Sequence, residues 1–359
     1  MLFRSSKSRA LRIVSSSKLF HLRTLNRYFP GAQGPSRVKA TQDDAGLGVS
    51  RRMRICVIGC GAVGSLFAAH LAKAGEAEVW AYDVWKEHIE AIRKNGLRLS
   101  GAADFTARPN ATSDVKELPR CDYGIVATKA IHTRNAIAQV AHIFDDNSAV
   151  CSVQNGVGNE EIIAEHVKYV IRGTTFPAGH PIGPGHIGYD IKGDTWIGPF
   201  ELTNTSMNQV EELAGWITRS GMNTIALKDA RGAQWTKLIF NASTNPVGAL
   251  TLLHHGAATR FGAIGQLFND LISEGEAVAE KLGIELHGDP RELVRKGSSA
   301  PGKHRASMLQ DVLAKRQTEV DFMNGAIVQW GEKVGVPTPL NKALWGLIKG
   351  LEHSWTDPD

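Results

Sequence analysis

The sequence predicts an α/β protein with two domains: an N-terminal domain built on a parallel β-sheet, followed by an all-helical C-terminal domain. Three observations support this fold class. The length of 359 residues suits two domains. Apolar strand-like runs alternate with helical segments after residue 53, which is typical of a parallel sheet covered by helices. Residues 229–353 follow a helical period almost throughout.

We expect residues 1–52 to form an unstructured basic extension, with domains at 53–228 and 229–353. The extension carries eleven Lys and Arg but two acidic residues, so the rest of the chain is net acidic although the total charge is +5. We therefore expect no nucleic-acid partner. The sequence contains no run of about 18 apolar residues, so we expect no membrane-spanning helix. Residues 1–42 have the acid-free composition of a transit peptide, so a mitochondrial location is the alternative to a cytoplasmic one.

The first strand and helix are predicted by residues 54–58, a short β-branched run before a glycine, and by residues 62–74, which have helical spacing and stop at Gly75. The four cysteines lie in or beside apolar runs, so we expect reduced thiols and no metal site. These cysteines are Cys56, Cys60, Cys121 and Cys151. The same criteria predict strands at 78–83, 123–129, 149–154 and 169–175, and helices at about 86–94 and 132–143.

The end of the first domain has a different pattern. Residues 185–200 alternate between apolar and polar around a Lys-Gly-Asp turn, which predicts an antiparallel hairpin at the sheet edge. A helix at 207–219 and a strand at 222–227 complete the domain.

A glycine motif connects the first strand to the first helix. Its residues are Gly59, Cys60, Gly61, Ala62, Val63 and Gly64. In a Rossmann-type domain the first glycine permits the tight turn, the second lets a pyrophosphate approach, and the third lets helix and strand pack closely. The helix N-terminus then faces the phosphates. We predict a dinucleotide site here, the alternative being a glycine turn without a ligand.

Asp83 lies nineteen residues after Gly64, at the end of the second strand. An acidic residue there is expected to bind the ribose 2′-hydroxyl and to repel a 2′-phosphate, which favours NADH over NADPH. The alternative is that Asp83 only caps the following helix.

A second polar set follows helical spacing. Lys237, Asn241 and Asn245 recur every four residues within an apolar segment, so they share one face of a helix. We interpret this face as a wall for a polar ligand, with a solvent-exposed face as the alternative. Further along, Ser307 and Thr318 are predicted helix starts, and Asp321 follows Thr318 at capping-box spacing.

Seven segments of the chain carry a combined pattern. They are IGCGAVG (58–64), VATKA (126–130), QNGVGNEE (154–161), KLIFNASTNP (237–246), SSAPGKHRASMLQD (298–311), TEVDFMNG (318–325) and GVPTPLN (335–341). Together these segments resemble the ketopantoate reductase (2-dehydropantoate 2-reductase) family, from about residue 53 to about residue 350. The resemblance implies a Rossmann domain followed by a helical domain, and hydride transfer from NAD(P)H to the ketone of 2-dehydropantoate, giving (R)-pantoate for pantothenate biosynthesis.

The resemblance also implies residue roles. Lys237 matches the general acid and Glu319 the acidic residue beside the lysine and substrate. Asn155 matches the amide between cofactor and substrate, and Lys129 matches a lysine that contacts the cofactor. The residues that match groups holding the substrate hydroxyl and carboxylate are Asn241, Asn245 and Ser307.

One position departs from the family. Members that use NADPH usually carry a basic residue where this chain has Asp83, and residues 83–97 look more like NAD-dependent D-2-hydroxyacid dehydrogenases of the D-mandelate type. Another 2-keto acid is therefore the alternative substrate. A non-catalytic dinucleotide sensor is the alternative of another class, which the presence of Lys237 and Glu319 disfavours. A homodimer and a monomer both stay open.

Overall fold

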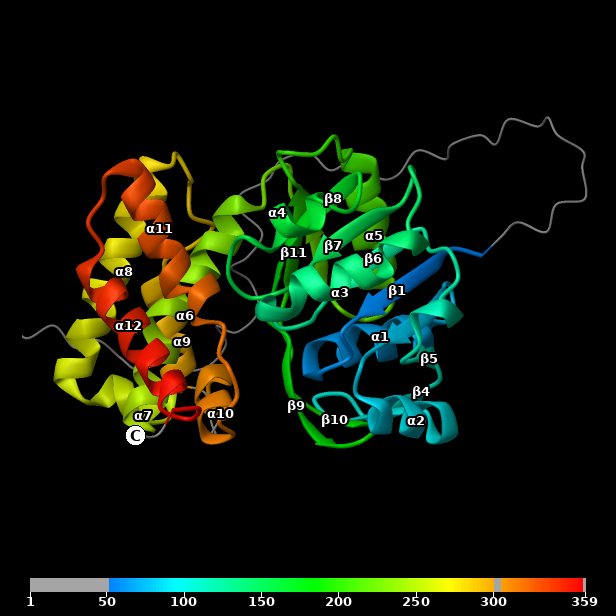
Figure 1. The fold of residues 1–359 in the computed structure, drawn as a ribbon, viewed down its shortest axis with the longest axis horizontal. Helices are drawn as coiled ribbons and strands as arrows, with labels where there is room; N and C mark the ends of the chain where they lie inside the picture. The colour runs from blue at the N-terminus through cyan, green and yellow to red at the C-terminus, as the bar shows by residue number, and fades with distance from the viewer. Residues whose placement is uncertain (1–51, 300–304, 358–359) are drawn as a thin grey trace, which may run out of the picture. The chain divides into compact units, whose positions relative to one another are not determined.

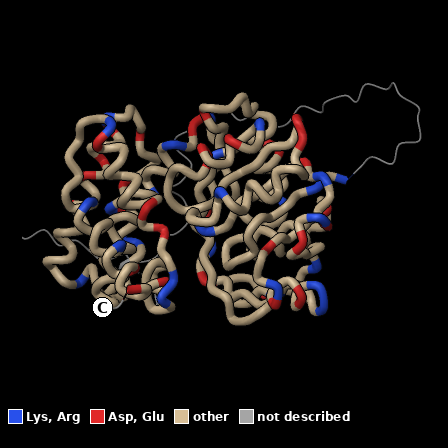
Figure 2. The backbone as a smooth tube through the Cα atoms, in the orientation of Figure 1, with Lys and Arg blue, Asp and Glu red and all other residues tan. Residues whose placement is uncertain are grey.

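The computed structural model describes residues 52–299 and 305–357 (Figure 1). Except for Arg52, the predicted basic extension lies outside the described residues, as do residues 300–304 of the segment at 298–311. In the described part, Lys and Arg are interspersed with Asp and Glu along the chain (Figure 2). No helix in this part is long and apolar enough to cross a membrane.

The predicted parallel sheet is present and has eight strands in the order β12-β11-β8-β7-β6-β1-β2-β5. Neighbouring strands are parallel except β8 and β11, which are antiparallel. The strands are β1 (Arg54–Ile58), β2 (Glu78–Tyr82), β5 (Asn110–Thr112), β6 (Tyr123–Val126), β7 (Ala149–Ser152), β8 (Tyr169–Thr175), β11 (Thr195–Pro199) and β12 (Thr224–Ala226).

Helices cover both faces of this sheet, as the continuous apolar strands require. In β1, Ile55 and Val57 belong to a core shared with α1 and α5, whereas Cys56 and Ile58 belong to a second core shared with α3 and α4. Side chains alternate across a strand, so adjacent residues of β1 enter different cores. The helices are α1 (Ala62–Ala74), α2 (Lys86–Asn95), α3 (Thr133–Val140), α4 (Asn159–Ala164) and α5 (Met207–Arg219).

The predicted hairpin at residues 185–200 is wrong. A second sheet has the order β4-β3-β10-β9, and β10 pairs with β9 through a turn at Gly185, while β11 joins the main sheet beside β8. Residues 192–194 therefore connect two sheets. The alternation was real, because Ile187 and Tyr189 of β10 are buried in the core with α1, but alternation fixes the buried face and not the pairing partner. The strands are β3 (Leu97–Gly101), β4 (Phe105–Ala107), β9 (Ala178–Gly183) and β10 (His186–Ile191).

The helical C-terminal region is confirmed. Its central helix is α6 (Arg231–Thr251), which packs against α8, α9, α10 and α12 and continues through Pro246. The remaining elements are α7 (His255–Arg260), α8 (Gly262–Lys281), α9 (Pro290–Ser299), α10 (Ser307–Leu313), the 3-10 turn η4 (Val320–Phe322), α11 (Asn324–Val334) and α12 (Pro339–His353).

The helix start predicted at Ser307 is confirmed, because Ser307 is the first residue of α10 and follows the cap residue Ala306. The start and capping box predicted at Thr318 are wrong, because the cap position before η4 belongs to Glu319. The carboxylate of Asp321 accepts hydrogen bonds from Trp345 and Lys349 instead of closing a capping box with Thr318. Tertiary partners on α12 therefore replace the local pattern.

Candidate active site

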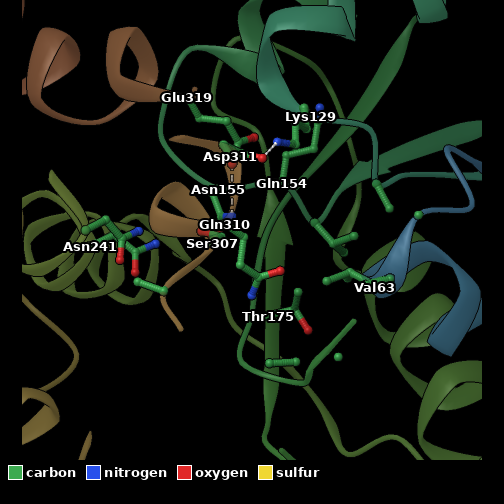
Figure 3. Close-up of a pocket in the computed structure, with 18 of the residues that line it drawn as sticks. Val63, Lys129, Gln154, Asn155, Thr175, Asn241, Ser307, Gln310, Asp311 and Glu319 are labelled. Atoms are coloured by element: carbon green, nitrogen blue, oxygen red, sulfur yellow. Dashed lines mark hydrogen bonds and ion pairs between the residues drawn. The ribbon is translucent and has the colours of Figure 1, made fainter. Parts of the chain in front are cut away.

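A pocket of about 1840 Å³ is lined by residues of both the sheet domain and the helical region. The glycine loop and the carboxyl ends of β1, β2, β6 and β7 supply one wall, and α6 and α10 supply another. Ligands of open α/β sheets bind beyond the carboxyl ends of the strands, so the pocket lies where a dinucleotide is expected. Figure 3 shows side chains that line it.

The three motif glycines differ in what surrounds them. A Cβ on Gly59 would lie 2.6 Å from the backbone nitrogen of Thr128, and one on Gly64 would lie 1.8 Å from the carbonyl oxygen of Gly59. These two glycines hold the turn against the sheet. Gly61 lines the pocket, and apart from Gly61 and its two chain neighbours, no heavy atom of the residues that the structure describes lies within 4 Å of the place where its Cβ would be. That open space before the N-terminus of α1 fits a pyrophosphate.

The rest of the motif divides between pocket and core. Ala62 and Val63 line the pocket, whereas Cys60 and Gly64 do not. The side chain of Cys60 is fully buried, and burial raises the pKa of its thiol. Cys60 therefore acts through its backbone, whose N–H donates to Asp83 over 2.6 Å.

Asp83 is held by backbone amides on both sides. Its Oδ2 accepts from Cys60, and its Oδ1 accepts from the N–H of Trp85 over 2.8 Å. Asp83 also lines the pocket. The carboxylate thus supports the turn before α2, but the cap position of that helix belongs to Trp85 and not to Asp83.

Lys129 follows β6 and lines the pocket, but its ammonium forms an ion pair with Asp311 of α10 (Figure 3). The carboxylate of Asp311 is buried and also lies 3.3 Å from the guanidinium of Arg316. Sequence reasoning gave Asp311 no role, although the segment SMLQD contains it. The sequence feature that could have indicated a role for Asp311 is its acidic side chain within an apolar helical segment.

The ammonium of Lys237 meets the sheet domain at two points. It donates to Oδ1 of Asn155 over 2.9 Å and to the carbonyl oxygen of Thr175 at the end of β8. Nδ2 of Asn155 donates to Oε2 of Glu319 over 3.2 Å, and the N–H of Ala130 donates to Oε1 of Glu319 over 2.8 Å. Asn155 therefore lies between Lys237 and Glu319.

Burial shifts both charged groups toward their neutral forms. Burial lowers the pKa of Lys237 to about 8, and the charge of Glu319 opposes that shift. Burial raises the pKa of Glu319, opposed by the hydrogen bonds from Ala130 and Asn155 and by the charge of Lys129. An ammonium with a pKa near 8 can donate a proton near neutral pH.

The remaining predicted polar residues also reach the pocket. Asn241 and Asn245 lie on the same face of α6 as Lys237 and are only 7% and 6% exposed, so the solvent-exposed alternative is wrong. Nδ2 of Asn245 lies 3.8 Å from Sδ of Met323. Ser307 lines the pocket from the first turn of α10 (Figure 3).

Sequence reasoning missed an aromatic wall beside Lys237. The rings of Phe176 and Trp196 pack edge to face with centroids 5.4 Å apart, and both residues line the pocket. The ammonium of Lys237 lies 5.3 Å from the centroid of Phe176. Phe240 on α6 lines the same pocket. No motif marks these residues, because they belong to elements far apart in sequence.

A glycine loop suited to a dinucleotide, together with a half-buried ammonium and two buried amides in the same pocket, defines an NAD(P)H-dependent oxidoreductase. Family comparison gives the same class. The model for "Ketopantoate reductase PanE/ApbA" matches residues 55–201, and that for "Ketopantoate reductase PanE/ApbA C terminal" matches residues 229–352. The chain belongs to the ketopantoate reductase family.

Named relatives agree with this assignment. A 2-dehydropantoate 2-reductase of Archaeoglobus fulgidus is 33% identical over 306 residues, covering 84% of this chain and 99% of the relative. One of Pyrococcus abyssi is 33% identical over 301 residues, covering 84% and 98%. The chain is accordingly a 2-dehydropantoate 2-reductase-like oxidoreductase.

Solved structures include both branches considered above. A PanE/ApbA family ketopantoate reductase from Ralstonia eutropha has a TM-score of 0.76 and 28% identity, covering 84% of this chain and 99% of that one. D-mandelate dehydrogenase, in a ternary structure with NADH and anilino(oxo)acetate, has a TM-score of 0.77 and 27% identity with the same coverage. The fold is therefore shared by enzymes with different substrates.

Proposed function

We propose that this protein reduces the ketone of 2-dehydropantoate to (R)-pantoate, as a step in pantothenate biosynthesis. The observation that carries the proposal is the contact of Lys237 with Asn155 and, through it, with Glu319, in a pocket that also contains the glycine loop. The proposed division of labour assigns the cofactor to residues 53–228 and the substrate to residues 229–353.

The chemistry follows from these side chains. Bound NAD(P)H supplies the hydride. As the ketone is reduced, negative charge builds on its oxygen, and Lys237 donates a proton there. Asn155 orients the ammonium through its oxygen, and Glu319 fixes the orientation of Asn155 by accepting from its nitrogen. The proposed donors and acceptors for the substrate carboxylate and hydroxyl are Asn241, Asn245 and Ser307.

For the cofactor, we propose NADH over NADPH. Two backbone amides fix the carboxylate of Asp83 at the pocket wall, where it can accept from a ribose 2′-hydroxyl and would repel a 2′-phosphate. Gly59, Gly61 and Gly64, with the intervening residues, form the pyrophosphate loop. When the cofactor binds, Lys129 leaves its ion pair with Asp311 and contacts the cofactor with its ammonium group.

A second candidate is the reduction of a 2-keto acid with an aromatic tail, as in the D-mandelate type. The observation that favours it is the wall formed by Phe176, Trp196 and Phe240 beside Lys237, since aromatic rings pack well against one another. The non-catalytic sensor is disfavoured, because a sensor does not need Lys237 and Glu319 joined through Asn155.

The test is consumption of NADH and of NADPH by the purified protein with a panel of 2-keto acids. The proposal expects the highest kcat/KM with 2-dehydropantoate and NADH. A higher kcat/KM with an aromatic 2-keto acid supports the second candidate. Tight NADH binding with no turnover of any panel member would leave only the sensor.

We also propose a cellular location for the protein. A cytoplasmic location suits a biosynthetic reductase, and mitochondrial import through residues 1–42 is the alternative. Fractionation with the full chain and with residues 1–42 deleted distinguishes them. Sedimentation analysis decides between a monomer and a homodimer.

A further inference from the structure

A buried polar network lies behind the active site. It consists of Arg172 on β8, Glu160 on α4 and Gln234 on α6, which are 4%, 0% and 2% exposed. None of these three described residues is among those lining the pocket. Burying polar and charged side chains is costly unless they are paired, so a network of this kind calls for a physical reason.

The carboxamide of Gln234 is fixed in one orientation by its partners. Its Oε1 accepts from Nη1 of Arg172 over 2.5 Å, and Arg172 can only donate. Its Nε2 donates to Oε1 of Glu160 over 2.8 Å and to the carbonyl oxygen of Gly156 over 3.3 Å. A flipped carboxamide would place its oxygen against two acceptors and its NH₂ against the guanidinium.

Arg172 is itself anchored from the other side. Both of its hydrogen bonds from Nη2 go to the carboxylate of Glu201, at 2.8 and 2.7 Å, and its guanidinium lies 5.0 Å from the ring centroid of Phe200. The orientation of the Gln234 carboxamide is therefore set by residues of the sheet domain and not by neighbours on its own helix.

This network touches the catalytic contact at both of its ends. Gln234 precedes Lys237 by three residues, which places the two side chains on one face of α6. Gly156 directly follows Asn155 in the loop after β7. Gln234 thus binds the backbone of the loop, while Lys237 binds the side chain of Asn155 one residue earlier.

The loop has little freedom to compensate. Gly156 has φ of +84°, and a Cβ there would lie 2.3 Å from the carbonyl oxygen of Phe322. The N–H of Val157 donates to that same oxygen over 3.1 Å, and Nδ2 of Asn159 donates to the carbonyl oxygen of Asn155 over 3.1 Å. With the loop held on three sides, the position of α6 decides how Lys237 meets Asn155.

We propose that Gln234 is a positioning residue for the reaction: it joins α6 to the carbonyl of Gly156 and thereby sets the contact between Lys237 and Asn155. Glu160 and Arg172 hold its carboxamide in the required orientation. The inference rests on the proposed role of Lys237 as proton donor. Small misplacement of a catalytic group is costly, since even about 1 Å can reduce a rate about 100-fold.

The first experiment compares Gln234→Asn, which shortens the side chain but keeps the amide, with Gln234→Glu, which keeps the shape but loses the donors. Both are expected to lower kcat about 10- to 100-fold, with the Kd for NADH within about twofold, since the glycine loop is on a separate element. Both should also move the alkaline limb of kcat to higher pH, because a looser Lys237 is better hydrated. Gln329→Glu, on the exposed face of α11, is the matched control.

A role in stability alone would lower the melting temperature without moving the alkaline limb. The inference would be overturned if the Gln234→Asn and Gln234→Glu enzymes fold and keep both the kcat of the parent and the pH at which the parent kcat falls in the alkaline range. If neither variant folds, Glu160→Leu and Glu160→Gln decide. Glu160→Leu removes an acceptor of Gln234 and should lower kcat, whereas Glu160→Gln keeps an oxygen there and should lose less. Equal kcat values for the two would overturn the inference.

Lys237→Ala separates this inference from the proposed function. If Lys237→Ala keeps the parent kcat, both the proton-donor role and the inference fail. If Lys237→Ala is impaired and Gln234→Asn is not, only the inference fails.

Discussion

Lys237 and Asn155 are 82 residues apart, yet the ammonium of Lys237 lies 2.9 Å from the carboxamide oxygen of Asn155. An amide orients the ammonium without neutralising it, and Glu319 is reached only through the other end of Asn155. A directly paired carboxylate would raise the pKa of Lys237 and make its proton harder to give up. The spacing thus suits a proton donor.

Lys237→Ala is expected to lower kcat about 10²- to 10⁴-fold, the range for loss of a positioned proton donor. The Kd for NADH should change little, because the loop around Gly61 and Asp83 lies on other elements. Steady-state kinetics and NADH titration check this. Lys281→Ala, on the exposed surface of α8, is the control. A Lys237→Ala enzyme with more than half the parent kcat would remove Lys237 from the mechanism.

The reduction should slow as the pH rises through about 8. Burial lowers the pKa of Lys237 to about 8, so the protonated form that donates is present below this pH and is lost above it. The measurement is kcat at saturating substrate and cofactor across the alkaline range, with circular dichroism to show that the fold persists. A flat profile up to pH 10 would contradict the assignment.

Asp83→Arg should reverse the cofactor preference from NADH to NADPH. The substitution replaces a carboxylate that repels a 2′-phosphate with a guanidinium that attracts it. Asp83→Asn is the neutral comparison and should narrow the preference without reversing it. Ratios of kcat/KM for the two cofactors are the measurement. If the parent enzyme already prefers NADPH tenfold or more, Asp83 serves only the turn before α2.

Gly61→Ala and Gly64→Ala form a matched pair in the glycine loop. Gly61→Ala should fold with the parent melting temperature but bind NADH weakly, because its methyl group enters open space in the pocket. Gly64→Ala should prevent folding or lower stability severely, because its Cβ would lie 1.8 Å from the carbonyl oxygen of Gly59. Parent-like NADH affinity in Gly61→Ala would show that the pyrophosphate does not approach there.

Glu160→Gln should stabilise the protein increasingly as pH rises. Burial raises the pKa of Glu160 to about 7, above its ordinary value of 4.5, so the ionised carboxylate disfavours the folded state. The stabilisation by Glu160→Gln is absent below the ordinary pKa of 4.5, which applies to the unfolded chain. It grows between pH 4.5 and about 7 and is complete above about pH 7. The gain in unfolding free energy from pH 4 to pH 8 should be on the order of 3 kcal/mol. Denaturant unfolding at pH 4 and pH 8 measures this gain, and Glu211→Gln on the exposed surface of α5 is the control. An equal gain in unfolding free energy at both pH values would contradict the prediction.

The sequence predicts the elements with strong local patterns. The segments at 54–58 and 62–74 coincide with β1 and α1, because a buried parallel strand and a glycine-terminated helix are encoded locally. The pairing of β10 with β3 is not encoded locally, since it brings together residues 186–189 and 98–101. Alternation along β10 was compatible with either partner strand.

The candidate site divides in the same way. Lys237, Asn241 and Asn245 follow from helical spacing on α6. The burial of the two asparagines and the position of all three in the pocket lining agree with the ligand-facing interpretation. The ion pair of Asp311 with Lys129 and the aromatic pair of Phe176 and Trp196 could not be predicted, because tertiary packing alone makes these contacts. Resemblance supplied Asn155 and Glu319, whose connection to Lys237 only the three-dimensional arrangement shows.

The reactivity of the four cysteines can report local unfolding of the protein. Cys56, Cys60, Cys121 and Cys151 are free and buried, and burial raises the pKa of the Cys60 and Cys151 thiols. Alkylating reagents attack the exposed thiolate, so each cysteine should react only when its surroundings transiently unfold. Because Cys60 belongs to the glycine loop and Cys121 precedes β6, mass-resolved alkylation rates would compare loop opening with global unfolding. Saturating dinucleotide should then slow labelling of Cys60 more than labelling of Cys121.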